Sequence, residues 1–302
     1  MSAGELIAIR SGDRKAVVDE QGAALVQVSV AGVDLLVTAS DDDRPDQGCY
    51  GQLLIPWPGR IPGGAYQFGG EDCVLPIDHL VSHSAIHGLV RWAPWQVLEL
   101  GPCRVTMGYR LLARPGYPFS LAIEQSYAWE QDRLEIRTTA TNIGRRTAPY
   151  GYGAHPYFTV GTPSIDTAVL QVPARSYFRS DASLEPKLPA VPVGGSVYDF
   201  RQPRSVGAIE LDVTYTELTR DDEGRAAVHL SAPDGALTIT CTYTEPIVFV
   251  HLYSGDTLET RQREGLAIEP CTCLPNAFNN GAGLVSLVAG DSVTAHWAIV
   301  AG

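Results

Sequence analysis

The sequence lacks an excess of positive charge, a long apolar run and an apolar leader. Its 302 residues include 34 acidic and 22 basic side chains, a formal net charge of −12. Such a charge repels phosphate backbones and anionic lipids, so we expect neither a nucleic acid nor a membrane as a partner. No apolar run approaches the roughly 20 residues that cross a bilayer, and the first 20 residues carry no signal-peptide core. These absences predict a cytoplasmic protein.

The sequence also lacks a paired cysteine motif. Four of its six cysteines are scattered singly, and the close pair Cys271 and Cys273 is separated by one residue. One such pair without a second is poor spacing for zinc, so we predict no metal site. In the cytosol these thiols are expected to stay reduced, as small buried or half-buried side chains.

Helical signals are scarce, whereas 30 glycines and 21 prolines interrupt nearly every segment. Short runs that alternate apolar and polar residues predict strands, with hairpin turns at Ala31-Gly32 and Asp234-Gly235. Many short strands separated by Gly/Pro turns indicate a β-sandwich or barrel. We interpret the loop-rich region 161–205 as one elaborated loop and find no domain boundary.

Two segments near the first third of the chain hold unusual polar residues. Arg60 follows a Pro-Trp-Pro-Gly turn in residues 53–70, where it could bond backbone carbonyls or point its donors into a cleft. Residues 78–95 contain three histidines at four-residue spacing, but Gly88 and the β-branched context argue against a helical metal face. His87, next to this glycine, is the best placed for the lip of a loop.

Two later segments add a histidine and a carboxylate. His155 lies in "GYGAHPYFTV", where Pro156 forces an extended backbone at position 155. Glu269 closes the apolar run Leu266–Ile268, where burial would raise its pKa and make it a usable base. The alternatives are a histidine bonded to a carbonyl in the core and a buried ion pair of Glu269 with Arg60 or Arg91.

Taken in series, these segments resemble the aldose 1-epimerase (galactose mutarotase-like) family. The matching strings are "GRIPGGAYQFGG", "IHGLVRWAPW", "GAHPYF" and "LAIEPCTCLPNAFN", with "IELDVTYTEL" as a weaker fifth. The resemblance spans roughly residues 15–300 and implies one domain over residues 1–302. It implies an all-β fold, a large antiparallel β supersandwich with an open sugar-binding groove.

The resemblance also implies residue roles. Glu269 would be the general base and His155 the general acid, with His87 as a second histidine that assists catalysis. Arg60 and Asp212 would bind the sugar. The family uses neither metal nor nucleotide, so no cofactor is expected. The partner would be a small-molecule sugar substrate, and the protein would be a monomer or homodimer.

Two residues depart from the family pattern. Gly59 stands where many members have Asn, and Ser84 stands where relatives often have Asn. Both changes could reshape sugar contacts while leaving the proton-transfer pair intact.

The implied reaction interconverts α and β anomers by opening and closing the sugar ring. We expect Glu269 and His155 on opposite sides of the anomeric centre, with His155 protonated while Glu269 is ionised, and hence a bell-shaped pH–rate profile. Trp57 or Tyr157 could stack on the sugar.

The alternatives are a hexose-6-phosphate 1-epimerase with Arg60 and Arg91 near the phosphate, and a carbohydrate-binding protein without turnover. A metal-dependent hydrolase ranks third, because no second carboxylate has a comparable setting.

Overall fold

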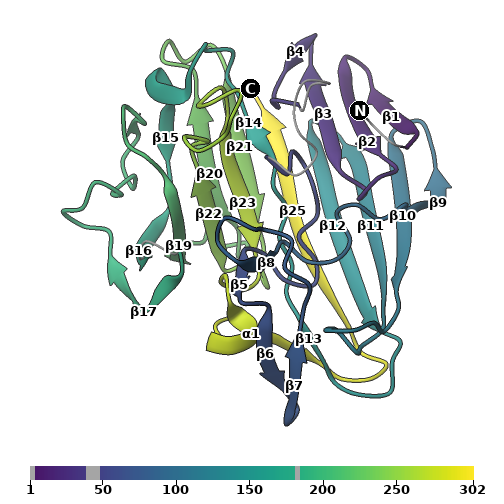
Figure 1. Cartoon of the computed structure of the whole chain (residues 1–302). Coiled ribbons are helices and arrows are strands. Elements are labelled where there is room, and N and C mark those ends of the chain that lie inside the picture. The colour runs from purple at the N-terminus through teal and green to yellow at the C-terminus, as the bar shows by residue number, and fades with distance from the viewer. Residues whose placement is uncertain (1–3, 39–47, 181–183) are drawn as a thin grey trace.

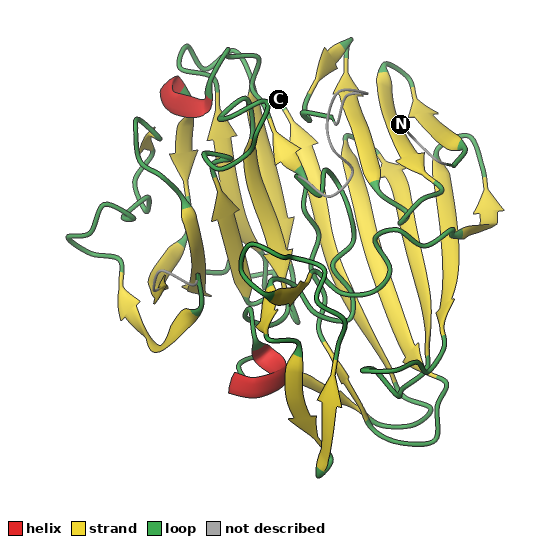
Figure 2. Ribbon diagram, viewed as in Figure 1, coloured by secondary structure: helices red, strands yellow, loops and turns green. Residues whose placement is uncertain are grey.

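The computed structural model describes residues 4–38, 48–180 and 184–302, and the following statements concern these residues (Figures 1 and 2). Almost every element is a strand, and all pairs of named strands run antiparallel. The largest sheet has nine strands. In order across the sheet they are β18 (Arg204–Ser205), β15 (Val169–Gln171), β20 (Ala226–Ser231), β21 (Thr238–Tyr243), β25 (Ser292–Ala301), β12 (Arg133–Asn142), β11 (Leu121–Glu130), β10 (Arg104–Leu111) and β9 (Gln96–Leu100).

A second sheet has six strands and carries most of the residues discussed below. In order they are β14 (Tyr157–Phe158), β23 (Leu266–Cys271), β22 (Phe249–Tyr253), β19 (Asp212–Leu218), β16 (Ala174–Ser180) and β17 (Pro186–Pro192). One hydrophobic core contains buried side chains of both large sheets, among them Leu252 and Ile268 from the six-stranded sheet and Ile239 and Ile299 from the nine-stranded sheet. The predicted all-β fold with large antiparallel sheets is confirmed.

Four smaller sheets complete the structure. The first contains β1 (Leu6–Ser11), β2 (Arg14–Asp19), β3 (Leu25–Val30) and β4 (Val33–Asp34), and the pairs are β5 (Arg60–Pro62) with β8 (Ser84–Ile86), β6 (Ala65–Phe68) with β7 (Glu71–Val74), and β13 (Ala148–Tyr150) with β24 (Val285–Leu287). The described helices are α1 (Ala277–Asn280) and the 3-10 turn η1 (Ile165–Thr167), and neither has the length or apolar character of a membrane span.

Both predicted hairpins are present. β3 and β4 are joined through Ala31 and Gly32, which both have positive φ, and β20 and β21 are joined through a turn that includes Asp234 and Gly235. Glycine adopts positive φ without steric cost, which explains its place in these turns.

The interpretation of residues 161–205 as one elaborated loop was wrong. The region contains η1 and four strands: β15 and β18 belong to the nine-stranded sheet, and β16 and β17 to the six-stranded sheet. β17 has three prolines but is an edge strand, which has a neighbour on one side only and is therefore a strand position where proline is tolerated. The prolines that suggested a loop are therefore compatible with a strand.

Candidate active site

All five candidate residues, although widely separated in the sequence, line one pocket. The pocket has a volume of about 850 Å³, and its lining includes Arg60, His87, His155, Asp212 and Glu269. Pockets of this size hold small organic ligands. The chain therefore brings two histidines, two carboxylates and a guanidinium group to one cavity.

The alternation of side chains along the six-stranded sheet forms one wall of this pocket. On β22, Val250 and Leu252 belong to the hydrophobic core, whereas His251 and Tyr253 line the pocket. Successive residues of a strand point to opposite faces, so the same pattern places Asp212 and Thr214 of β19 and Glu269 of β23 in the pocket lining. The wall is the face of the sheet that the core leaves open.

His155 and Glu269 are in direct contact. His155 Nε2 lies 3.3 Å from Glu269 Oε1, and both side chains are almost fully buried. The backbone holds the contact from two sides, because Gly153 bridges to Cys271 and the amide of Gly51 donates to the His155 carbonyl. His155 is the ion-pair partner of Glu269 within the described residues, so the alternative of a pair with an arginine is not what the structure contains.

Burial changes the protonation of this pair. It raises the pKa of Glu269 to about 7, with the charges of His251 and Arg60 opposing the rise. Burial, reinforced by the charge of His251, lowers the pKa of His155 to about 3. Two contacting groups titrate as a unit. The pair therefore holds a single proton between about pH 3 and about pH 7 in the free protein.

His87 is fixed as a neutral ring. Its Nδ1 accepts a hydrogen bond from the Gly59 amide at 3.1 Å, which leaves the proton on Nε2 as a donor. Burial and the nearby His155, Arg91 and Arg60 hold its pKa well below the usual range. His87 can therefore donate a hydrogen bond into the pocket, but it does not carry a charge near neutral pH.

Gly59 has a local reason for replacing the Asn of the family pattern. Its φ is +70°, and a Cβ there would lie 2.6 Å from Cβ of Pro275. A side chain at this position would be strained by the backbone and blocked by the proline ring. Ser84, the other departure, is buried, and its hydroxyl donates to the Ser82 carbonyl at 3.1 Å.

Arg60 and Asp212 differ in how they are held. Arg60 belongs to β5, and its Nε is buried without a hydrogen-bond partner in the described part of the chain. Asp212 begins β19, and its Oδ1 lies 3.3 Å from Nε2 of His251. This contact and the positive charge on His251 lower the pKa of Asp212, although burial opposes them. Arg60 thus offers an unused donor at Nε within the described residues, and Asp212 offers an ionised acceptor.

Arg91 lines the same pocket and supports the strand that precedes His87. Its Nη2 donates to Asp78 Oδ2 at 2.6 Å, while Asp78 Oδ1 accepts from the Ile86 amide at 2.8 Å. Ile86 is the last residue of β8 and directly precedes His87. Arg91 therefore fixes the strand that presents His87, and its charge is already matched by Asp78.

Sequence reasoning missed His251, Thr214 and Tyr253. His251 bonds Thr214 through Nδ1 at 2.9 Å and contacts Asp212 through Nε2. The alternation in "IVFVHLYSG" is the signal that could have found it, since Val248, Val250 and Leu252 alternate with Phe249, His251 and Tyr253.

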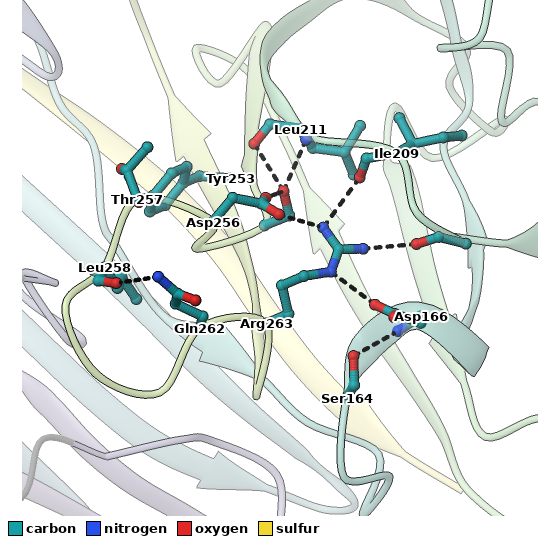
Figure 3. A network of polar contacts seen from close by, with 12 residues as sticks. Ser164, Asp166, Ile209, Leu211, Tyr253, Asp256, Thr257, Leu258, Gln262 and Arg263 are labelled. Carbon is teal, nitrogen blue, oxygen red and sulfur yellow. Dashed lines mark hydrogen bonds and ion pairs between the residues drawn. The ribbon is translucent and has the colours of Figure 1, made fainter.

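The segment after β22 forms another part of the pocket wall. Thr257, Leu258 and Glu259 line the pocket. Figure 3 shows the polar contacts of Arg263, which hold this segment. The Arg263 guanidinium donates to Asp256 at 2.8 Å, to Asp166 at 2.7 Å and to the carbonyls of residues 207 and 209. These bonds tie the segment to the residues that lead into β19.

The candidate stacking residues have different outcomes. Trp57 is buried in the core, where its ring lies 5.5 Å from that of Phe278, so its prediction as a sugar-stacking residue was wrong. Tyr157 lines the pocket, but its ring stacks on His155 at 5.0 Å. Tyr253, which is half-buried and bonds Thr257 through its hydroxyl, offers an aromatic face at the pocket wall.

Comparison with known proteins identifies relatives over nearly the whole chain. The protein-family model described as aldose 1-epimerase matches residues 5–299. The uncharacterized protein YihR of Escherichia coli is 34% identical over 288 residues, which cover 95% of this chain and 90% of YihR. Galactose mutarotase of Mus musculus is 27% identical over 172 residues, 53% of this chain and 48% of the mouse protein.

Solved structures share the fold at lower identity. A GalM/aldose epimerase homologue from C. elegans superposes with a TM-score of 0.87, 19% identity and 99% coverage of both chains. Galactose 1-epimerase from Lactobacillus acidophilus gives a TM-score of 0.84 at 18% identity, covering 100% of this chain and 96% of that one.

Proposed function

The chain belongs to the aldose 1-epimerase family, and from this premise we propose that it interconverts the α and β anomers of an aldose by opening and closing the sugar ring. The observation that carries the proposal is the contact of His155 Nε2 with Glu269 Oε1 at 3.3 Å in the pocket wall. Mutarotation needs one group that accepts the proton of the C1 hydroxyl and one that donates a proton to the ring oxygen O5, which is bonded to the same carbon. A buried carboxylate–imidazole pair that shares one proton meets this need.

Ring opening proceeds with one proton on the pair throughout. The Glu269 carboxylate takes the proton of the C1 hydroxyl, and the electrons of that O–H bond form the C1 carbonyl. The C1–O5 bond breaks, and O5 takes its electron pair together with the proton of His155. Rotation about C1–C2 then presents the other carbonyl face, and closure reverses each transfer, with Glu269 as donor and His155 as acceptor.

The arrangement of the pair differs from the expected one. The two side chains touch, so they do not stand on opposite sides of an anomeric carbon. Opposite placement is unnecessary, because the C1 hydroxyl oxygen and O5 are bonded to the same carbon. A sugar that presents this edge to the pair offers one oxygen to each group from the same side.

Other pocket residues would fix the sugar. His87 has its Nε2 proton free to donate because Nδ1 is occupied by Gly59. Arg60 has a buried Nε without a partner in the described residues, and Asp212 is an acceptor for hydroxyl groups. Tyr253 would offer its ring to the apolar C–H face of the sugar, a common way for proteins to bind a pyranose with few polar groups.

The test is a polarimetric or NMR measurement of anomerisation. Freshly dissolved α-glucose, α-galactose and glucose 6-phosphate are followed with and without the protein. We expect at least one unphosphorylated aldose to equilibrate at a rate that rises linearly with protein concentration. Preference for the phosphorylated sugar would favour the hexose-6-phosphate alternative. Sugar binding without any acceleration would show a carbohydrate-binding protein and would overturn the proposal.

The structure gives the phosphate alternative little support. That function needs cations without partners near a phosphate, and Arg60 and Arg91 were its candidates. Arg91 is buried and bonded to Asp78 at 2.6 Å. Both arginines have a buried Nε without a hydrogen-bond partner in the described residues, but the charge of Arg91 is already matched by Asp78.

A further inference from the structure

Three polar side chains form a row across neighbouring strands of the six-stranded sheet. Thr214 of β19 is the register partner of His251 on β22, and His251 is the register partner of Glu269 on β23. Directly opposite residues of an antiparallel pair have Cβ atoms about 5 Å apart. Thr214, His251 and Glu269 are therefore consecutive neighbours in the pocket wall.

His155 extends this row on the far side of Glu269. It precedes β14, which pairs with β23 on the side opposite β22. Gly153 likewise bridges to Cys271 on β23. The order across the wall is thus His251, Glu269 and His155, with the carboxylate between two imidazoles.

Both ring nitrogens of His251 have polar partners. Nδ1 lies 2.9 Å from the Thr214 hydroxyl oxygen, and Nε2 lies 3.3 Å from Asp212 Oδ1. An imidazolium ion has two N–H donors, so this arrangement satisfies the charged form completely. A neutral ring keeps both contacts only when the Thr214 hydroxyl donates to Nδ1.

The charges that surround His251 favour its protonated form. Burial alone would lower the pKa of His251, but Glu269 and Asp212 raise it above the usual range, with Arg60 opposing. The other two imidazoles of this part of the pocket, His87 and His155, have lowered pKa values. His251 is therefore the imidazole that carries a positive charge beside Glu269.

We propose that His251 is a positioning residue for the proton of the reaction: its positive charge drives the proton shared by Glu269 and His155 away from Glu269 and onto His155. This inference rests on the proposed function and deepens it. The charge of His251 opposes a proton on either group. Glu269 is its register neighbour, whereas His155 lies on the far side of Glu269, so moving the proton from Glu269 to His155 carries positive charge away from His251 and lowers the Coulomb repulsion. The result is a carboxylate and an imidazolium, the form that opens a closed sugar ring.

Removing the positive charge of His251 should change the pKa of Glu269 in a predictable direction. Without the cation, Glu269 binds its proton more tightly, so the pair loses that proton at a higher pH. We expect the midpoint of Glu269 ionisation to rise by about one pH unit. Because the proton then stays on Glu269, the form that opens the ring becomes rarer, and kcat/KM at pH 6 falls roughly fivefold.

The experiment compares His251→Gln with His229→Gln. His229 of β20 also bonds a cross-strand threonine, Thr240, through Nδ1 at 3.0 Å, but it does not line the pocket. Infrared difference spectra follow the protonated carboxyl band of Glu269 from pH 4 to pH 9, and the Glu269→Gln spectrum identifies the band. The pH dependence of kcat/KM, which reports the free protein, is measured in parallel.

The expected result is an upward shift of both the infrared midpoint and the basic limb of kcat/KM in His251→Gln, and neither in His229→Gln. An unchanged midpoint with a raised KM would show that His251 only contacts the sugar, and it would overturn the inference. If the wild-type protein accelerates no aldose, the proposed function is wrong, whereas the infrared midpoint still decides whether His251 controls the proton.

Discussion

The two large sheets carry the same kinds of polar pair in different surroundings. The six-stranded sheet has His155 with Glu269 and His251 with Thr214. The nine-stranded sheet has His296 with Glu135 and His229 with Thr240. Only the first set lines the pocket, so the pairs themselves do not mark a functional site.

The neighbours of each pair make the difference. Arg133 Nε also lies 2.9 Å from Glu135 Oε1, so a permanent cation matches the charge of Glu135. The ion-pair partner of Glu269 is the titratable His155 instead of an arginine, and burial raises the pKa of Glu269. Burial lowers the pKa of His229, whereas the carboxylates around His251 outweigh burial and raise it. A buried glutamate can therefore exchange a proton near neutral pH only where the group that balances its charge is itself titratable.

The largest effect should come from exchanging the two glutamates for glutamine. Glu269→Gln removes the proton acceptor, and we expect the anomerisation rate to fall by roughly 10²–10⁴-fold, the usual contribution of a positioned acid or base. Glu135→Gln removes a carboxylate that the structure uses for an ion pair, and activity should stay within about twofold of the wild type. Initial rates from polarimetry measure both. Comparable losses in the two variants would mean that position 269 has no special role.

The same two variants should differ in stability with opposite signs. Glu269 has an ordinary pKa of 4.5 and a folded pKa of about 7, so below pH 4.5 both states hold the proton and stability is unaffected. As pH rises toward 7, the unfolded state releases its proton and the folded state does not, which costs about 3 kcal/mol above pH 7. Glu269→Gln removes this cost.

Urea unfolding at pH 4 and pH 8 tests the sign. We expect Glu269→Gln to be more stable than the wild type at pH 8 and equal to it at pH 4, while Glu135→Gln is less stable at pH 8 because Arg133 and His296 lose their partner. A Glu269→Gln protein that is less stable at pH 8 would contradict a raised pKa for Glu269.

Local motifs predicted the residues of the site better than its arrangement. "GAHPYF" and "LAIEPC" indicated His155 and Glu269 because a proline, aromatics or an apolar run surrounds a titratable group. Both residues line the pocket together with Arg60, His87 and Asp212. What the motifs did not contain is the strand register that puts His155 and Glu269 in direct contact.

His251 shows why the remainder was missed. Its importance comes from its cross-strand neighbours on β19 and β23, which are distant in the sequence. Alternation assigns a face to each residue of one strand, but the pairing of three strands decides which side chains meet on that face. Trp57 illustrates the opposite error, since an aromatic residue beside Arg60 in the sequence points into the core.

The smallest expected effect concerns the two threonines. Thr214→Val removes the acceptor at Nδ1 of His251, so the charged ring loses a hydrogen bond. The pKa of His251 should fall by about half a unit, because His251 is half-buried and water replaces part of the lost bond. Thr240→Val should not lower the pKa of His229, because burial already favours the neutral ring, which takes the hydroxyl as donor rather than acceptor. NMR titration of the two imidazoles measures both shifts. Equal downward shifts would mean that the two threonines act alike on their histidines. The contrast between the two sheets would then come from the carboxylates alone.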